Sequence, residues 1–179
     1  DFIFMGSDAA RNDHNRSITL KLIDKISCPL VVFAGRYDKV GCDRIVLPVD
    51  LTKETKQKVD LAVKIAKIYG AKVYAVSATG SRDKETLKQL EDKMSEVKAI
   101  FDKLEIECET RLMKTEANVE SMANAVNDFA DDIEASAIII MTHQENKLQK
   151  FFVGSMATEL IKKANVPIVC VSPKELNNK

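Results

Sequence analysis

Apolar and polar positions follow two alternating patterns along residues 44–172. Short, nearly continuous apolar runs predict buried strands at 44–49, 72–78, 136–141 and 167–172, and alternating apolar and polar residues predict a further strand at 106–113. In the intervening segments, apolar residues recur every three or four positions, as they do in amphipathic helices. These segments predict helices over 52–70, 83–104, 119–133 and 154–164. Gly70 is expected to end the first of them.

This regular order of strands and helices predicts βαβ units, in which neighbouring strands run parallel. Runs such as "RIVLPV" and "AIIIM" are apolar throughout, as in strands that helices cover on both faces. We therefore predict an α/β fold, a doubly wound five-stranded parallel sheet with helices on both faces. Such sheets bind ligands at the carboxyl ends of their strands, where this chain carries Asp50, Ser77 and the loop 141–155.

The beginning of the chain repeats its end. "LKLIDKISCPLVVF" (20–33) matches "TELIKKANVPIVCV" (158–171) at an offset of 138, and "FIFMGS" (2–7) matches "AIIIMT" (137–142) at an offset of 135. We interpret this as a duplicated domain, because the repeat is far longer than a solenoid unit. The predicted parts are a remnant of a first domain (1–34), a linker (35–43), a complete domain (44–173) and a tail (174–179).

The first residues bear on this interpretation. The chain begins at Asp1 without a Met and runs directly into the apolar "FIFM". We expect a fragment of a longer tandem protein, with the product of a truncated gene as the alternative.

Composition and charge limit the classes of partner that the chain is expected to bind. Lys plus Arg and Asp plus Glu number 27 each, so the formal net charge of zero does not favour nucleic acid or an anionic membrane. No apolar run approaches the ~20 residues that span a bilayer. The four cysteines form no CxxC pair and no zinc-ligand pattern, so Cys28, Cys108 and Cys170 are expected to be buried apolar side chains. We predict a cytoplasmic protein with no metal site, no nucleic-acid partner and no membrane partner.

Three segments together resemble the universal stress protein family: "RIVLPVDLTKET" (44–55), "KVYAVSA" (72–78) and "AIIIMTHQ…VGSMATELIKKANVPIVCVSP" (137–173). The resemblance implies an adenine nucleotide α-hydrolase-like, Rossmann-like fold. Nucleotide-binding members of the family hold ATP phosphates with the pattern G-x2-G-x9-G-(S/T). Met141 and Gln144 occupy the positions of the first two glycines, while Gly154 and Ser155 keep the last pair.

The resemblance assigns three more positions. His143 falls on a histidine common in the motif, Asp50 on the acid of the first strand and Val76 on the adenine-side position of the second strand. Side chains at Met141 and Gln144 obstruct the approach of backbone N–H groups to phosphate, although a helix beginning after Gly154 still offers amides. We therefore expect no cofactor, with ATP binding left open. No nucleophile is placed beside His143, so we predict no catalytic residue.

The resemblance also implies a role in stress adaptation through partner interaction rather than turnover. We predict a non-enzymatic protein that forms a homodimer or a tandem-domain pair through its last strands, 30–33 and 167–171, because unpaired sheet edges invite partners. The first alternative is an ATP-binding sensor whose nucleotide occupancy controls partner binding. The second is an ATP-pyrophosphatase-type enzyme, which would need a glycine-rich loop that "LPVDLTKET" lacks.

Overall fold

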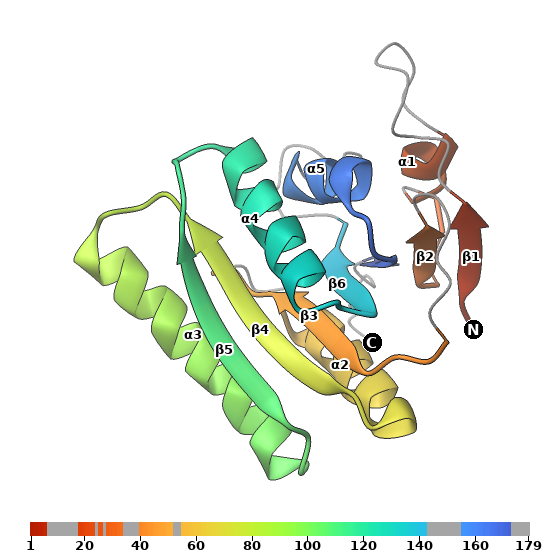
Figure 1. Cartoon of the computed structure of the whole chain (residues 1–179), viewed down its shortest axis with the longest axis horizontal. Helices are drawn as coiled ribbons and strands as arrows, with labels where there is room; N and C mark the ends of the chain where they lie inside the picture. The colour runs from red at the N-terminus through yellow and green to blue at the C-terminus, as the bar shows by residue number, and fades with distance from the viewer. Residues whose placement is uncertain are drawn as a thin grey trace, which may run out of the picture.

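The computed structural model describes residues 1–6, 18–23, 25–26, 28–33, 40–51, 55–142 and 155–172. Its strands are β1 (Ile3–Gly6), β2 (Leu30–Phe33), β3 (Arg44–Pro48), β4 (Lys72–Thr79), β5 (Cys108–Lys114), β6 (Ala137–Met141) and β7 (Ile168–Val171). Its helices are α1 (Ile18–Ile23), α2 (Thr55–Tyr69), α3 (Lys84–Lys103), α4 (Val119–Asp132) and α5 (Ser155–Lys163). All these strands join one sheet in the order β1-β2-β7-β6-β3-β4-β5 (Figure 1).

The predicted elements of residues 44–172 are confirmed, but the predicted five-stranded sheet is wrong in extent. Strands β3 to β7 run parallel to one another, with β3 between β6 and β4. Two further strands, β1 and β2, extend this sheet to seven strands. The contact between β2 and β7 is antiparallel, so the sheet is mostly rather than wholly parallel. The physical reason is the hydrogen-bonding edge of β7, which pairs with another strand of the same chain.

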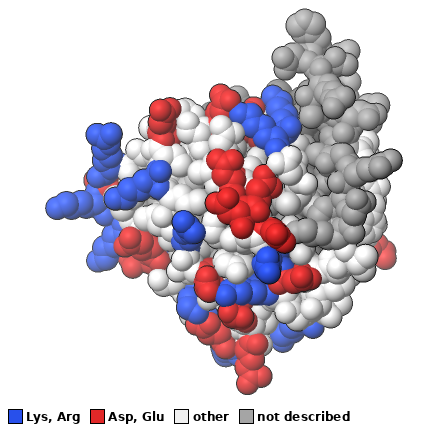
Figure 2. Space-filling model, viewed as in Figure 1, with Lys and Arg blue, Asp and Glu red and all other residues white. Residues whose placement is uncertain are grey.

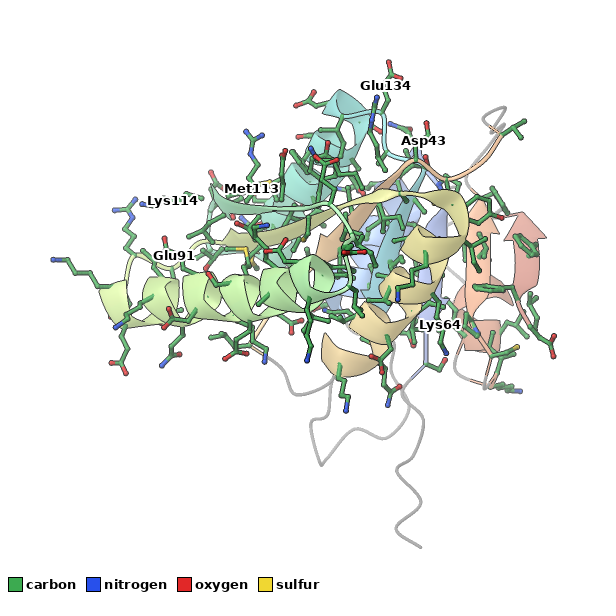
Figure 3. The ribbon with its side chains drawn as sticks, turned by 90° about the horizontal axis from the view of Figure 1, so that it is seen from below. Asp43, Lys64, Glu91, Met113, Lys114 and Glu134 are labelled. Atoms are coloured by element: carbon green, nitrogen blue, oxygen red, sulfur yellow. The ribbon has the colours of Figure 1, made fainter. Side chains whose placement is uncertain are left out.

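Helices cover both faces of the sheet. Figure 3 shows α2 and α3 on one side of the strands and α4 on the other. We call the side with α2 and α3 the α2 face, and the side with α4 and α5 the α5 face. The apolar cluster of the α2 face joins Leu47, Ile139 and Val169 to residues of α2 and α3. The cluster of the α5 face joins Val46, Ile138 and Ile168 to residues of α1, α4 and α5.

Local sequence explains where several helices begin and end. Asp83 caps α3 by accepting a hydrogen bond from the Thr86 amide at 2.8 Å. Asn118 caps α4 in the same way, at 2.7 Å from the Ser121 amide. Gly70 follows α2 with φ of +66°, a left-handed conformation that glycine adopts without strain, which confirms it as the end of that helix.

The pair β1·β2 has the same register as the pair β6·β7. Ile3 pairs with Leu30 as Ile138 pairs with Ile168, and the next three registered pairs also correspond at the two sequence offsets. The backbone hydrogen bond from the Ile3 amide to the Pro29 carbonyl (3.0 Å) corresponds to the one from Ile138 to Pro167 (2.9 Å). The sequence repeat is therefore also a repeat in strand pairing.

The antiparallel contact between β2 and β7 is symmetric under this repeat. Val31 pairs with Val169, which is its own equivalent at the offset of 138. Leu30 pairs with Cys170, and its equivalent Ile168 pairs with Val32. The two strands are thus related by a local twofold axis between Val31 and Val169. We call this contact the β2·β7 junction.

Candidate functional site

The chain reverses direction across the sheet at β3. It proceeds from β3 to β4 and β5 on one side, then returns to β6 on the other, so the switch point lies between β3 and β6. Registered pairing of β3 with β6 covers only Ile45 and Val46, whereas pairing with β4 continues to Pro48. The carboxyl halves of β3 and β6 are therefore not paired with each other. This is the position where open α/β sheets bind ligands.

The opposite, amino edge of β3 is closed by hydrogen bonds. The Ser136 hydroxyl oxygen accepts from the amide of Asp43 at 3.0 Å, and the Arg44 guanidinium donates to the Ile133 carbonyl at 2.6 Å. Asp43 and Glu134 lie together at this end of the molecule in Figure 3. The candidate site is consequently confined to the carboxyl edge.

Asp50 is half-buried two residues after the end of β3. Residues of β3 pair with residues 92 positions later in β6. Continued past the strand ends, this register sets Asp50 level with Thr142, which follows β6. Thr142 is fully buried, and its amide (3.0 Å) and hydroxyl (3.3 Å) both donate to the Val171 carbonyl. Thr142 is therefore bound to β7.

Met141 is half-buried at the end of β6 and packs against the apolar cluster of the α2 face. Its side chain thus belongs to the edge of the core. Val76 is fully buried within the cluster of the α5 face, and its carbonyl accepts a hydrogen bond from the Val49 amide at 2.7 Å. Neither side chain is available as a freely exposed ligand contact.

Ser155 is exposed and begins α5, so the first amides of that helix lie next to it. His143, Gln144 and Gly154 lie outside the described residues. Of the positions predicted for the site, the structure places Asp50 and Met141 at the carboxyl edge beside the switch point and Val76 inside the core. Ser77, named with them, is buried within β4 instead of lying at its end.

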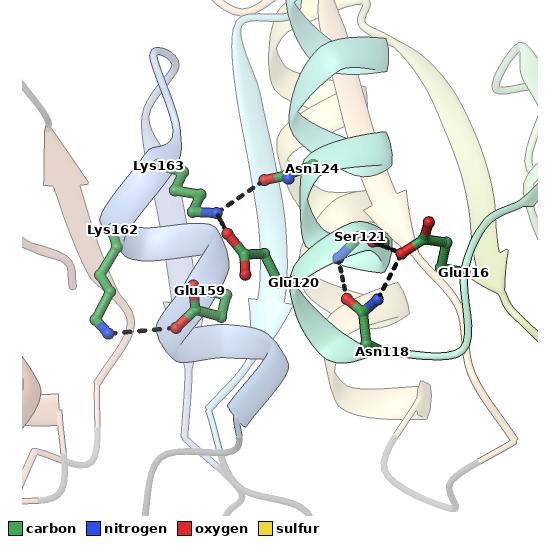
Figure 4. Close-up of polar contacts among 8 residues, drawn as sticks. All are labelled: Glu116, Asn118, Glu120, Ser121, Asn124, Glu159, Lys162 and Lys163. Atoms are coloured by element: carbon green, nitrogen blue, oxygen red, sulfur yellow. Dashed lines mark hydrogen bonds and ion pairs between the residues drawn. The ribbon is translucent and has the colours of Figure 1, made fainter.

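Polar contacts between α4 and α5 escaped sequence reasoning, because they join residues far apart in the chain. The Lys163 ammonium lies 2.5 Å from the Glu120 carboxylate and 3.2 Å from the Asn124 amide oxygen (Figure 4). The hydrogen bond from Lys163 lowers the pKa of the Glu120 carboxyl below its usual range. These contacts hold the carboxyl end of α5 against α4 and so help to orient the helix that begins at Ser155.

The surface carries no extended region of one charge on the face seen in Figure 2. Acidic and basic side chains lie side by side there, with acidic groups gathered near the middle. No group of His, Cys, Asp and Glu in the described ranges could hold a metal ion, and no helix among them is long and apolar enough to cross a membrane.

Two cysteines behave as predicted. Cys108 and Cys170 are buried, and burial raises the pKa of their thiols to about 11 and about 12. Cys28 is only partly buried, so the prediction of a buried side chain holds for two of the three. Thiols with such raised pKa values stay protonated near neutral pH and are poor nucleophiles.

A pocket of about 350 Å³ lies away from the switch point. It is on the α2 face, between the exposed side of α2 and the β2·β7 junction, and its lining includes Phe2, Gln57, Lys64 and Val171. The pocket is therefore associated with the region where the repeated segments meet.

Residues 41–172 match the family model described as the universal stress protein family. The chain belongs to the universal stress protein family. A universal stress protein of Methanocaldococcus jannaschii is 26% identical over 147 residues, which cover 74% of this chain and 84% of that protein.

Two solved structures of universal stress proteins extend the comparison. One, from Archaeoglobus fulgidus in complex with dAMP, is 26% identical with a TM-score of 0.59, covering 72% of this chain and 97% of that one. A second, also from Archaeoglobus fulgidus, has a TM-score of 0.73 at 18% identity. That alignment covers 97% of this chain but only 61% of the other, so the fold of this chain corresponds to part of a longer one.

Proposed function

We propose that this universal stress protein acts without catalysis, through contacts with partners, and that its nucleotide site is weakened. The observation that carries the proposal is Met141, which takes the position of the first phosphate-loop glycine and packs into the core edge. A glycine there would let the backbone approach a phosphate closely. Met141 instead brings an apolar side chain that has no hydrogen bond to offer.

The hydrogen bonds beside Met141 favour the same conclusion. The amide and hydroxyl of Thr142 are both engaged by Val171, so neither is directed to an anion at the switch point. The amides that follow Ser155 can receive an anion, whereas the Asp50 carboxylate suits a ribose hydroxyl rather than a phosphate, so the phosphate site is incomplete.

The proposal includes the tandem arrangement. Residues 1–33 share both sequence and strand register with residues 136–171, and the β2·β7 junction relates the two segments by a twofold axis. The longer Archaeoglobus fulgidus chain, whose fold aligns with 97% of this one, supports the same idea. The last strands would thus join two universal stress protein units, and partner binding would involve this paired architecture.

A nucleotide titration with engineered glycines tests the weakened site. We expect millimolar Mg–ATP to leave the thermal midpoint of the unaltered chain unchanged, and the double variant Met141→Gly/Gln144→Gly to gain a clear shift. A ligand at 100 times its Kd adds about 2.7 kcal/mol to the free energy of unfolding. The control variant Met113→Gly/Gln89→Gly carries the same substitutions away from the site and should show no ATP effect.

A second candidate function is an ATP-binding sensor whose nucleotide occupancy controls partner binding. The complex of the Archaeoglobus fulgidus relative with dAMP favours it, because that relative is 26% identical and of the same family. The titration separates the two candidates when dAMP and AMP are included. Micromolar binding of any of these nucleotides to the unaltered chain would replace the first proposal by the second.

A further inference from the structure

Strand β1 lies at one end of the sheet (Figure 1). Apolar side chains in this strand and just before it are exposed. In the described part of the chain its only strand neighbour is β2. Phe2 is 41% exposed, Ile3 37% and Phe4 68%. An edge strand with exposed apolar residues is the kind of surface that takes another strand.

The equivalent residues of β6 show how apolar side chains at these positions become buried. Ala137, Ile138 and Ile139 stand at the offset of 135 from Phe2, Ile3 and Phe4, and all three are at most 7% exposed. They are covered because β3 pairs with β6 in parallel, while α2 packs over the face of Ala137 and Ile139 and α4 and α5 pack over the face of Ile138. Strand β1 pairs with β2 as β6 pairs with β7. The exposed fractions of the two strands differ because, among the described residues, β1 has no counterpart of β3 and α2.

Three aromatic side chains form a row on the α2 face beside this edge. The ring centroids of Phe2 and Phe4 are 6.4 Å apart, and those of Phe4 and Phe33 are 6.1 Å apart with the rings stacked. Phe4 and Phe33 correspond to Ile139 and Val171, which belong to the α2-face cluster. We call Phe2, Phe4 and Phe33 the aromatic row. The 350 Å³ pocket borders it at Phe2.

We propose that the edge of β1 facing away from β2 and the aromatic row bind a strand–helix unit of the kind formed by residues 44–69, carried by a neighbouring universal stress protein unit. The strand would run parallel to β1 beside Phe2 and Ile3, as β3 runs beside Ala137 and Ile138. The helix would place an apolar stripe over the aromatic row, as α2 places Val59, Ala62 and Ala66 over its own face. This inference rests on the tandem arrangement proposed above.

A second copy of β1 fits this surface less well. Two β1 edges paired about a twofold axis would join their backbones but set the two aromatic rows side by side on the same face. Each row would keep its exposed rings, because α1, the helix that follows β1, packs on the α5 face and not over the row. A strand that is followed by an amphipathic helix satisfies both the backbone edge and the apolar face.

The test adds a copy of residues 41–135 directly before Asp1, which is the equivalent of Ser136, and follows hydrogen exchange of residues 1–6. We expect exchange in this segment to slow at least about tenfold relative to the unaltered chain. The variant Phe4→Glu, made in the extended protein, should restore fast exchange. Ile100→Glu introduces the same charge at an exposed position on α3 and should leave the protection intact.

A peptide of residues 42–70 provides a second measurement that does not require the added copy to fold. Titrated against the unaltered chain, it should shift the ring resonances of Phe4 and Phe33, and Phe4→Glu should abolish the shift of Phe33. Unchanged exchange of residues 1–6 in a folded extended protein, or no resonance shift at millimolar peptide, would overturn the inference.

Two further measurements show which part of the inference is wrong if the expected protection of β1 is not seen. Protection of residues 28–33 and 167–172 reports the β2·β7 junction. Its loss would contradict the tandem arrangement itself, whereas its retention without protection of β1 contradicts only the edge inference. If the unaltered chain is a dimer that Phe4→Glu dissociates and Ile100→Glu does not, a second copy occupies the edge and the inference is wrong.

Discussion

Asn127 on α4 is the least satisfied polar side chain in the described part of the chain. It is 5% exposed, and neither its amide nitrogen nor its amide oxygen has a hydrogen-bond partner there. A buried amide without partners costs about 1–3 kcal/mol by the measure of mutational studies. Leucine has a similar shape and removes both polar atoms.

We expect Asn127→Leu to raise the free energy of unfolding by about 1–2 kcal/mol, measured by urea denaturation. Asn124→Leu is a suitable control, because Asn124 lies one turn earlier, is half-buried and accepts a hydrogen bond from Lys163. It should give no gain. A loss of stability in Asn127→Leu would mean that the amide has a partner outside the described residues.

At the scale of elements, two loops on the carboxyl edge meet at Gly80. A Cβ added to Gly80 would lie 2.2 Å from the Ala117 Cα and 2.4 Å from the Ala117 nitrogen. The loop after β4 and the loop before α4 therefore touch through backbone atoms, which cannot move aside as a flexible side chain would. This contact sets the distance between the beginnings of α3 and α4.

Gly80→Ala should consequently lower the free energy of unfolding by about 2–3 kcal/mol, the upper part of the range for overpacking. Thermal and urea denaturation both measure this effect. Gly6→Ala is the matched control, since an added Cβ at Gly6 meets nothing within 4 Å. Equal stability of the two variants would show that the loops separate at little cost.

At the scale of the whole molecule, the β2·β7 junction determines which strand pairs with the edge of β7. Its pairing is symmetric under the repeat, so a second β7 can adopt the register that β2 adopts, with Val169 opposite Val169 of the partner subunit. Removing residues 1–40 leaves the segment that matches the family model but exposes this edge.

We expect the chain of residues 41–179 to form a dimer through β7, as measured by light scattering. The full chain, whose β7 edge is occupied by β2, should not associate in this way. Hydrogen exchange of residues 167–172 locates the contact, because these amides stay protected only if a second strand replaces β2. A truncated chain that remains monomeric with unprotected β7 would contradict the prediction.

Much of this architecture follows from local sequence. Hydrophobic periodicity is a property of each segment, so the strands and helices of residues 44–172 could be predicted together with their order and their parallel pairing. The repeat, at offsets of 135 and 138, also indicated that β1 and β2 resemble β6 and β7. Part of the site was accessible in the same way, since Asp50 follows β3 and Met141 ends β6, and the carboxyl ends of these strands share one edge of the sheet.

The sequence by itself therefore determined the elements, the repeat and the residues at the ends of the strands. The tertiary structure decided that β2 completes the edge of β7, that Val76 lies within the core, and that Thr142 is held by Val171. The reason is that edge pairing, burial and hydrogen-bond partners depend on residues far apart in the chain, and periodicity within one segment carries no information about them.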